Sequence, residues 1–213
     1  MKNWKQQREK KAYLALEDGT VYRAWSFGAP VDRLGEVVFN TGMTGYQEIL
    51  TDPSYAGQLV TLTAPEIGNT GFNTADFESS RIHAEGLIVH RCNAPSNWRA
   101  EQSLAQALIS SGVPGLAGID TRALTIRLRN TGTLKGFLCS TGAVPLEEGV
   151  ARACEWAGLD NQDYAQKVST LDAYIFDPDD TLTATWGIAE GPLPEADIPV
   201  VAIDYGLKRN ILR

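Results

Sequence analysis

The sequence has little of what metal centres and disulfide frameworks need. Its 213 residues include two histidines and three cysteines. Cys92, Cys139 and Cys154 lie far apart, and no pair has the short ligand spacing that zinc sites use. An odd number of widely spaced cysteines favours free thiols in a reducing compartment. We therefore expect neither a bound metal nor a disulfide bridge.

Long apolar runs and an excess of positive charge are also lacking. No stretch approaches the about 18 to 20 apolar residues of a membrane span, and no apolar run follows the basic start of the chain, as it would in a signal peptide. The formal net charge is −7, whereas binding to a polyanion needs a basic surface. We expect a cytoplasmic protein that binds neither membrane nor nucleic acid.

Short strand-like runs fill the chain from about residue 13 to 142. An apolar content of 43% and a charged content of 21% are ordinary for a globular protein. The runs are rich in Val, Leu, Thr or aromatic residues and end at Gly, Asp or Pro, which is typical of strands joined by turns. They are AYLALEDG (12–19), GTVYRAWSFG (19–28), GEVVFNTG (35–42), GQLVTLTAP (57–65), EGLIVHRC (85–92) and GTLKGFLCS (132–140).

Two helices are predicted between the later runs. In the first, Ser96-Asn97 can cap a segment with Leu104 and Leu108 on one face, and Gly112 can end it. The second runs from Asp120 to Gly132. The fold class is therefore α/β.

The second helix carries arginines around an apolar stripe. Leu124 and Leu128 lie four residues apart, and Arg122, Arg127 and Arg129 spread over the remaining surface. A solvated basic face is the favoured interpretation, and docking of a partner is the alternative.

The character of the chain changes after residue 142. Pro145 can start a helix that ends at Gly158, and the stretches 177–180 and 191–199 are rich in turn residues. The apolar run Val200 to Ile203, followed by the start of a helix at Lys208, is typical of the first strand and helix of a buried parallel sheet. We expect a connector and then the start of a second domain.

No set of residues in the sequence forms a complete catalytic site. His90 and Cys92 would share one face of a strand, but no third orienting group or nucleophile elbow accompanies them, and His83 is equally alone. We therefore favour a structural role for all three.

Phosphate binding and acid catalysis have equally weak signals. The glycines of NTGMTG and IGNTGFN lack the spacing of nucleotide-binding loops. The acid pairs Glu147-Glu148 and Asp179-Asp180 occupy a helix start and a turn, where acids are favoured locally. The chain is thus either an interaction module or the non-catalytic half of an enzyme.

Several stretches resemble, in order, the motifs of one family, the small subunit of glutamine-hydrolysing carbamoyl-phosphate synthase. The resemblance runs from residue 14 to 213, and its core, FNTGMTGYQEILTDPSY, is specific. The motifs are LEDGTVY, GEVVFNTGMTGYQEILTDPSYAGQLVTLT, IGNTGFN, ESSRIHAEGLIV, GIDTRALTIRLRNTGTLKG and AIDYGLKRNILR.

This resemblance implies the domain organisation. It implies a swivelling β/β/α N-terminal domain over residues 1–142 and a linker with a helix over 143–198. Residues 199–213 would be the incomplete start of a doubly wound α/β domain, a class I glutamine amidotransferase.

The resemblance also implies a function. Members of the family hydrolyse L-glutamine at a Cys–His–Glu triad and pass ammonia to a large subunit, which uses ATP, Mg and bicarbonate to make carbamoyl phosphate for arginine and pyrimidine biosynthesis. The implied partners are that large subunit and L-glutamine, and no cofactor is expected in this chain. None of the three cysteines lies in the family's Gly-x-Cys-x-Gly elbow, so we expect the 213-residue chain alone to be inactive and assign it no catalytic residue.

The resemblance implies one glutamine-binding residue in this sequence. Ser54, in the Asp-Pro-Ser-Tyr turn, matches the serine that contributes to binding glutamine, although a serine after Asp-Pro can also simply cap a turn. Met43, Tyr46 and Gln47 match the same motif, and we expect them only to shape the loop. The alternative function is a non-catalytic interaction module of the same fold.

Overall fold

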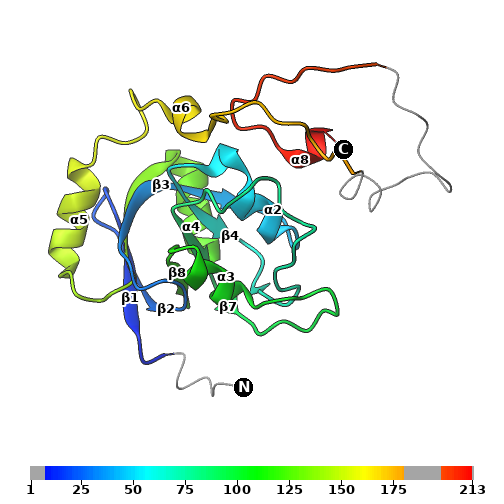
Figure 1. Ribbon diagram of the computed structural model, residues 1–213. Coiled ribbons are helices and arrows are strands. Elements are labelled where there is room, and N and C mark those ends of the chain that lie inside the picture. Colours follow the sequence, from blue (N-terminus) through cyan, green and yellow to red (C-terminus); the bar gives the residue numbers. More distant parts are fainter. Residues whose placement is uncertain (1–7, 180–197, 213) are drawn as a thin grey trace.

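A closed barrel of strands forms the centre of the computed structural model, which describes residues 8–179 and 198–212 (Figure 1). The strands are β1 (Lys11–Leu16), β2 (Val21–Ser26), β3 (Arg33–Asn40), β4 (Gln58–Leu62), β5 (Glu66–Ile67), β6 (Gly86–Val89), β7 (Arg91–Cys92), β8 (Gly115–Ala117) and β9 (Leu134–Cys139). Around the barrel the order is β1, β2, β8, β6, β4, β3, β9, and β9 pairs with β1 to close it. β5 and β7 pair separately.

Helices connect and cover the strands. They are α2 (Tyr46–Thr51), α3 (Leu104–Ser110), α4 (Thr121–Thr131), α5 (Leu146–Glu155), α6 (Tyr164–Val168) and α8 (Arg209–Leu212), with a short 3₁₀ turn, η1 (Pro53–Tyr55). β3, β4, β6 and β8 are parallel neighbours, whereas β1 is antiparallel to both β2 and β9. Parallel neighbours need crossover connections, and α2 with η1 lies in the connection from β3 to β4.

Alternate side chains of the strands build two different clusters. Leu14, Leu59 and Leu138 belong to one buried cluster, to which α4 adds Leu124 and Leu128. The strand residues next to them point to the opposite face, because side chains alternate along a strand. One face of the sheet therefore packs with α4.

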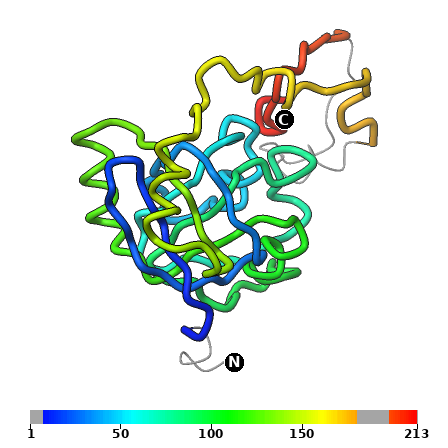
Figure 2. Tube along the Cα trace, turned by 90° about the vertical axis from the view of Figure 1, so that its left-hand side faces the viewer, coloured from blue at the N-terminus to red at the C-terminus, as the bar shows by residue number. Residues whose placement is uncertain are grey.

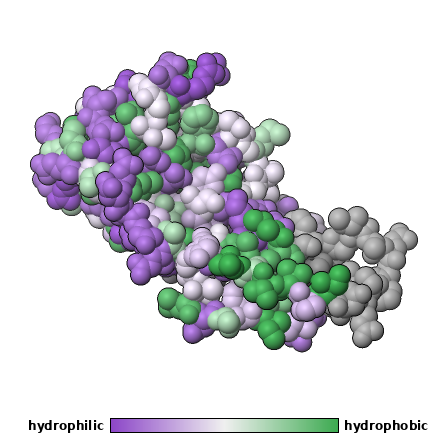
Figure 3. All heavy atoms as spheres, turned by 90° about the horizontal axis from the view of Figure 1, so that it is seen from above, coloured by the Kyte–Doolittle hydropathy of each residue, from purple (hydrophilic) through white to green (hydrophobic). Residues whose placement is uncertain are grey.

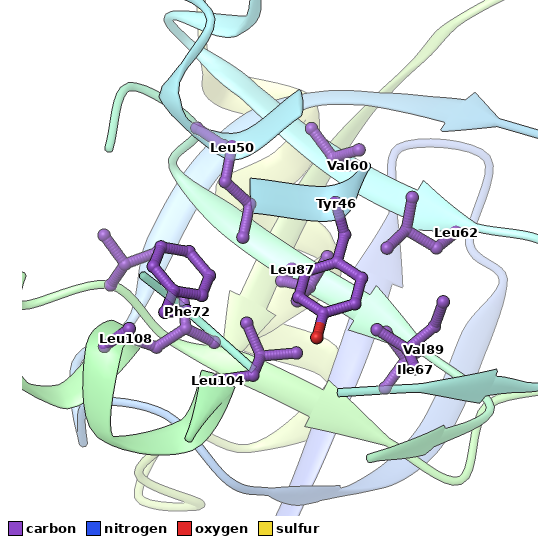
Figure 4. Packing of buried hydrophobic residues seen from close by; sticks show 13 residues of the cluster. Tyr46, Leu50, Val60, Leu62, Ile67, Phe72, Leu87, Val89, Leu104 and Leu108 are labelled. Atoms are coloured by element: carbon purple, nitrogen blue, oxygen red, sulfur yellow. The ribbon is translucent and has the colours of Figure 1, made fainter. Parts of the chain in front are cut away.

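The second cluster lies beneath α2 and α3. Tyr46 and Leu50 of α2 meet Leu104 and Leu108 of α3 over the parallel strands, and Phe72 fills the space between them (Figure 4). All five side chains are buried. α2 is therefore fixed to the barrel.

The antiparallel side of the barrel is covered by α5. Tyr13 and Phe137 pack with Ala153, and Val150 lies at the edge of this cluster. The first part of the predicted linker thus packs on the barrel. Its predicted helix forms with Pro145 as the N-cap, but it ends at Glu155 and not at Gly158.

The strand-like runs and the signals at the ends of α4 agree with the structure. All six strand-like runs contain strands, and Gly19 adopts a positive φ in the predicted turn between β1 and β2. The helix predicted from Asp120 to Gly132 forms as α4, with Asp120 accepting a hydrogen bond from the Ala123 N–H and Gly132 as the C-cap. The strand-rich α/β part of the predicted fold class is confirmed.

The predicted start of α3 is wrong. Its N-cap is Ser103, whose hydroxyl accepts from the Gln106 N–H in a capping box, whereas Ser96 and Asn97 lie in the loop before it. Ser103 is followed three residues later by Gln106, the pairing that a capping box needs. Ser96 is followed at that distance by Arg99, which cannot complete the box.

The predicted strand at Val200 to Ile203 does not form. This run lies outside any strand, and no strand within residues 8–179 and 198–212 pairs with it. Its side chains are exposed, and Figure 3 shows an apolar region beside the grey atoms on this side of the molecule. The exposed large apolar residues here are Leu171, Tyr174, Ile175, Ile198, Val200, Val201, Ile203, Tyr205 and Ile211.

Parts of the predicted linker lie outside the described residues, including Asp180 and most of 191–199. The domain boundaries 1–142, 143–198 and 199–213 therefore stay predictions. Among the helices of the described chain, none is both long and apolar enough to cross a membrane.

Candidate functional site

Ser54 lies on an exposed turn at the end of α2. α2 ends at Thr51, and Asp52 then caps η1 by accepting a hydrogen bond from the Ser54 N–H on its Oδ1 atom at 2.9 Å. Pro53 at the first position of η1 has the φ that such a turn requires. The cap is therefore Asp52, and in the described part of the chain the Ser54 hydroxyl has no hydrogen-bond partner.

Buried polar groups hold the base of this turn. The Thr51 hydroxyl donates to the carbonyl of Gln47 at 2.9 Å and accepts from the N–H of Glu78 at 2.9 Å. The hydroxyl of Ser79 donates to the carbonyl of Thr51 at 2.6 Å. Thr51 and Glu78 are both buried, so these bonds are shielded from water.

A terminal segment, residues 204–212, docks against the Ser54 turn. Lys208 Nζ lies 2.7 Å from Asp52 Oδ2, and α8 lies beside the segment around residue 52 in both ribbon and tube views (Figures 1 and 2). Gly206 comes so close to Pro53 and Val168 that a Cβ on it would lie 3.0 Å from Pro53 Cβ and 2.7 Å from Val168 Cγ2. Asp52 therefore holds the turn with one oxygen and the terminal segment with the other.

Glu78 makes a second connection to the terminal segment. Its carbonyl accepts from the Arg209 N–H at 2.8 Å, and its carboxylate accepts from the backbone N–H of Asn210 at 3.1 Å and from the Asn210 side-chain amide. Glu78 thus accepts hydrogen bonds from two backbone N–H groups at the start of α8.

Asp204 shapes the start of the terminal segment. Its Oδ1 accepts from the N–H groups of Gly206 and Leu207, each at 2.8 Å, and its Oδ2 accepts from the Tyr174 hydroxyl at 3.1 Å. Burial alone would raise the pKa of Asp204, but these hydrogen bonds to its charged form outweigh it and lower the pKa. The carboxylate is thus ionised at neutral pH.

Tyr46 and Gln47 anchor α2 to the loop before β6, and their role in shaping the loop of Ser54 stays a prediction. The Tyr46 hydroxyl donates to the carbonyl of Gly71 at 3.1 Å. The Gln47 side chain donates to the carbonyl of Asn73 at 2.5 Å and accepts from its N–H at 2.9 Å. Met43 differs, because its side chain points into solvent.

His83 lies close to the turn. Its Nε2 is 3.0 Å from the hydroxyl of Ser79, and its backbone N–H donates to the carbonyl of Leu50 at 2.9 Å. Burial, and then the charge of Arg81, lower its pKa. His83 is therefore neutral at pH 7 and supports the loop that carries Glu78.

His90 and Cys92 do not form a catalytic pair. His90 lies between β6 and β7, and its Nδ1 is 3.1 Å from the carbonyl of Ile119. Cys92 packs against the cluster beneath α2 and α3, and burial raises the pKa of its thiol to about 12. A thiol with this pKa is protonated at neutral pH and is a poor nucleophile.

The other sequence candidates have local roles. Glu148 forms an ion pair with Arg152 one turn along α5, and Arg127 of α4 pairs with Asp18 at 2.6 Å while Arg122 and Arg129 are exposed. Cys92, Cys139 and Cys154 are free thiols. Within residues 8–179 and 198–212, no cluster of His, Cys, Asp and Glu could hold a metal ion.

The Ser54 hydroxyl is the exposed polar group of this turn. It lies on a fixed turn beside the terminal segment, and neither His83 nor His90, the histidines of the described residues, forms a hydrogen bond with it. The family resemblance singled out Ser54, whose binding role stays a prediction, and the sequence did not single out Asp52, Glu78 and Lys208. The position of Asp52 before Pro53-Ser54 could have identified it, because Asp commonly caps turns.

Comparisons with known proteins agree on one family. A family model described as "Carbamoyl-phosphate synthase small chain, CPSase domain" matches residues 14–138. The "Carbamoyl phosphate synthase small chain" of Vibrio cholerae is 50% identical over 211 residues, which is 96% of this chain and 54% of that one.

Relatives in other bacteria give the same result. The proteins with that name from Nostoc sp. and Bacillus caldolyticus are 48% and 47% identical over 95% of this chain, and the matches cover 52% and 50% of their lengths. The chain thus spans about half the length of the curated relatives it matches. Among solved structures, an aminopeptidase from Aneurinibacillus sp. strain AM-1 aligns with a TM-score of 0.41 and 15% identity, over 63% of this chain and 31% of that one, which supports no conclusion.

Proposed function

Because the chain belongs to the family of carbamoyl-phosphate synthase small chains, we propose that it forms the N-terminal half of a glutaminase subunit. In this role it helps to supply ammonia from L-glutamine to a large subunit. The large subunit uses that ammonia with bicarbonate, ATP and Mg to make carbamoyl phosphate. A cytoplasmic location, the swivelling β/β/α type of the first domain and the three domain boundaries belong to the same proposal.

Ser54 binds L-glutamine in this proposal. The supporting observation is that Asp52 caps the turn, which leaves the exposed Ser54 hydroxyl available to a ligand. Glutamine has an α-amino and an α-carboxylate group, which need a few well-placed polar partners. A serine hydroxyl on a fixed turn can both donate to the carboxylate and accept from the ammonium group.

In this proposal, the position of the terminal segment supports a location for the rest of the site. Lys208 and Asn210 are held against the Ser54 turn by Asp52 and Glu78. In a longer chain, the polypeptide that continues from α8 would start from this fixed position. The triad that cleaves glutamine would then lie beyond residue 213, close to the Ser54 turn.

Reconstitution with a large chain tests this proposal. The chain extended to the length of its relatives should support glutamine-dependent synthesis of carbamoyl phosphate, whereas the 213-residue chain should not hydrolyse glutamine. Turnover of glutamine by the purified 213-residue chain would contradict the location of the triad. The nucleotide sequence that follows codon 213 gives a second test, because a stop codon without a Gly-x-Cys-x-Gly elbow would favour the interaction module.

A further inference from the structure

A cavity of about 200 Å³ lies between the start of α2 and the loop that follows β7, at the opposite end of α2 from the Ser54 turn. The residues that line it come from three stretches of chain and are mostly polar. They are Thr44, Gly45, Gln47, Glu48, Thr70, Gly71, Asn73, Asp76, Asn97 and Arg99. The site proposed above for glutamine uses none of the side chains in this cavity.

Two large apolar side chains flank the cavity and face solvent. Met43 precedes Thr44 and is 79% exposed, and Trp98 lies between Asn97 and Arg99 and is 91% exposed. Over residues 8–156, the other large apolar side chains exposed to solvent are Ile109 and Ile126, at 53% and 46%. Trp, Met and Arg are enriched at protein interfaces, and Trp is frequent among the residues that dominate binding energy.

The backbone holds Trp98 at a fixed turn. The Asn97 side chain accepts from the Arg99 N–H at 2.8 Å, and the Asn97 carbonyl accepts from the Ala100 N–H at 3.2 Å. The N–H of Ser96 donates to the carbonyl of Asn69 at 2.8 Å. A side chain presented by a fixed loop loses less conformational freedom on binding.

The cavity also holds the carboxylate of Glu48. Arg99 pairs with Asp76 at 2.7 Å, whereas in the described chain no Lys or Arg forms an ion pair with Glu48. Burial raises the pKa of Glu48, and the neighbouring charges of Asp76 and Glu78 raise it further. Its own backbone N–H and the charge of Arg99 oppose this rise but do not cancel it. A cation placed beside Glu48 would therefore be favourable.

We propose that the surface formed by Met43, Glu48, Trp98 and Arg99 docks the large chain of the synthase. The partner places an apolar side chain against Met43 and Trp98 and a Lys or Arg side chain beside Glu48. This inference rests on the proposed function for its partner, but its surface is independent of the Ser54 turn. A second copy of the chain fits less well, because each copy carries a net charge of −7 and the cavity is acidic.

Binding to the purified large chain tests the surface. The dissociation constant would be measured by titration for the unsubstituted chain, Trp98→Ala, Glu48→Gln and the control Ile126→Ala, which removes an exposed apolar side chain from α4. We expect Trp98→Ala to weaken binding at least about tenfold, Glu48→Gln to weaken it to a smaller extent, and Ile126→Ala to leave it within about twofold. Circular dichroism and thermal unfolding show whether each variant is folded.

Each alternative outcome has a distinct meaning. Equal binding by the unsubstituted chain, Trp98→Ala and Glu48→Gln would show that this surface does not dock the large chain. The proposed function would not be affected. No binding by the unsubstituted chain would overturn both the surface and its partner. Self-association that Trp98→Ala abolishes, measured by sedimentation, would assign the surface to a second copy and overturn the choice of partner.

Discussion

Lys208 and Asp52 form an ion pair, with Nζ and Oδ2 2.7 Å apart, that joins the terminal segment to the Ser54 turn. The same carboxylate caps η1 through its other oxygen. One buried side chain therefore fixes both the shape of the turn and the position of the segment that follows Asp204. This shared role gives the first two predictions.

Asp52→Asn should loosen the terminal segment. An amide can still accept from the Ser54 N–H, but it removes the charge that pairs with Lys208. We expect amide hydrogen exchange to become faster over residues 206–211, measured by mass spectrometry. Glu66→Gln is the matched control, because it removes an exposed ion pair with Arg91 far from the turn. Unchanged exchange in Asp52→Asn would show that the pair does not hold the segment.

The same pair predicts how docking depends on pH. The hydrogen bond to Asp52 raises the pKa of Lys208 above its ordinary value of 10.5. A lysine with a raised pKa in the docked state stabilises that state fully below its ordinary pKa, and this contribution is lost as pH rises through the raised value. Exchange in residues 206–211, corrected for the intrinsic effect of pH, should thus stay slow at neutral pH and increase only in strong alkali. Faster corrected exchange of residues 206–211 between pH 7 and 9 would contradict this expectation, because it would mean that the terminal segment is released there.

Gly149→Ala should destabilise the protein although alanine favours helices. At a helix position without close neighbours, replacing glycine by alanine stabilises a protein by roughly 0.5–1 kcal/mol. In α5, however, a Cβ would lie 2.7 Å from Cε2 of Tyr13, and overpacking of this kind costs about 1–3 kcal/mol. We expect a lower free energy of unfolding in urea. If the clash is the cause, Gly149→Ala should cost less in a Tyr13→Ala background, whereas an equal cost in both backgrounds would reject it.

The three cysteines should differ in reactivity. Burial raises the pKa of Cys92 to about 12, Cys139 is buried, and Cys154 is exposed. Iodoacetamide at pH 8 should therefore label Cys154 alone in the folded protein and all three thiols in urea, as counted by mass spectrometry. Rapid labelling of Cys92 in the folded protein would mean that its environment is open to solvent.

Local signals explain what the sequence could predict. The boundaries of α4 follow from Asp120 and Gly132, which act within one turn of the helix ends. α2 was missed because its six residues lie between Gly45 and Pro53, both of which usually mark turns. Its helical form depends on Tyr46 and Leu50 reaching the cluster beneath them.

Long-range contacts explain what the sequence could not predict. β1 closes the barrel against β9, and Glu78 meets Asn210 across 132 positions of the chain, so no local pattern reports either contact. The strand expected at Val200 to Ile203 shows the reverse case. Its apolar pattern is clear, but a strand needs a neighbour to satisfy its backbone groups.

The glutamine KM of Ser54→Ala is the most direct test of the central claim, that the Ser54 turn binds a substrate cleaved elsewhere. It would be measured in the chain extended to the length of its relatives and combined with the large chain. The control is Ser110→Ala, which removes an exposed hydroxyl bonded only within α3. Loss of a hydrogen bond to a charged group predicts a KM about tenfold higher or more, with kcat little changed. A KM equal to those of the unsubstituted protein and Ser110→Ala would remove Ser54 from glutamine binding.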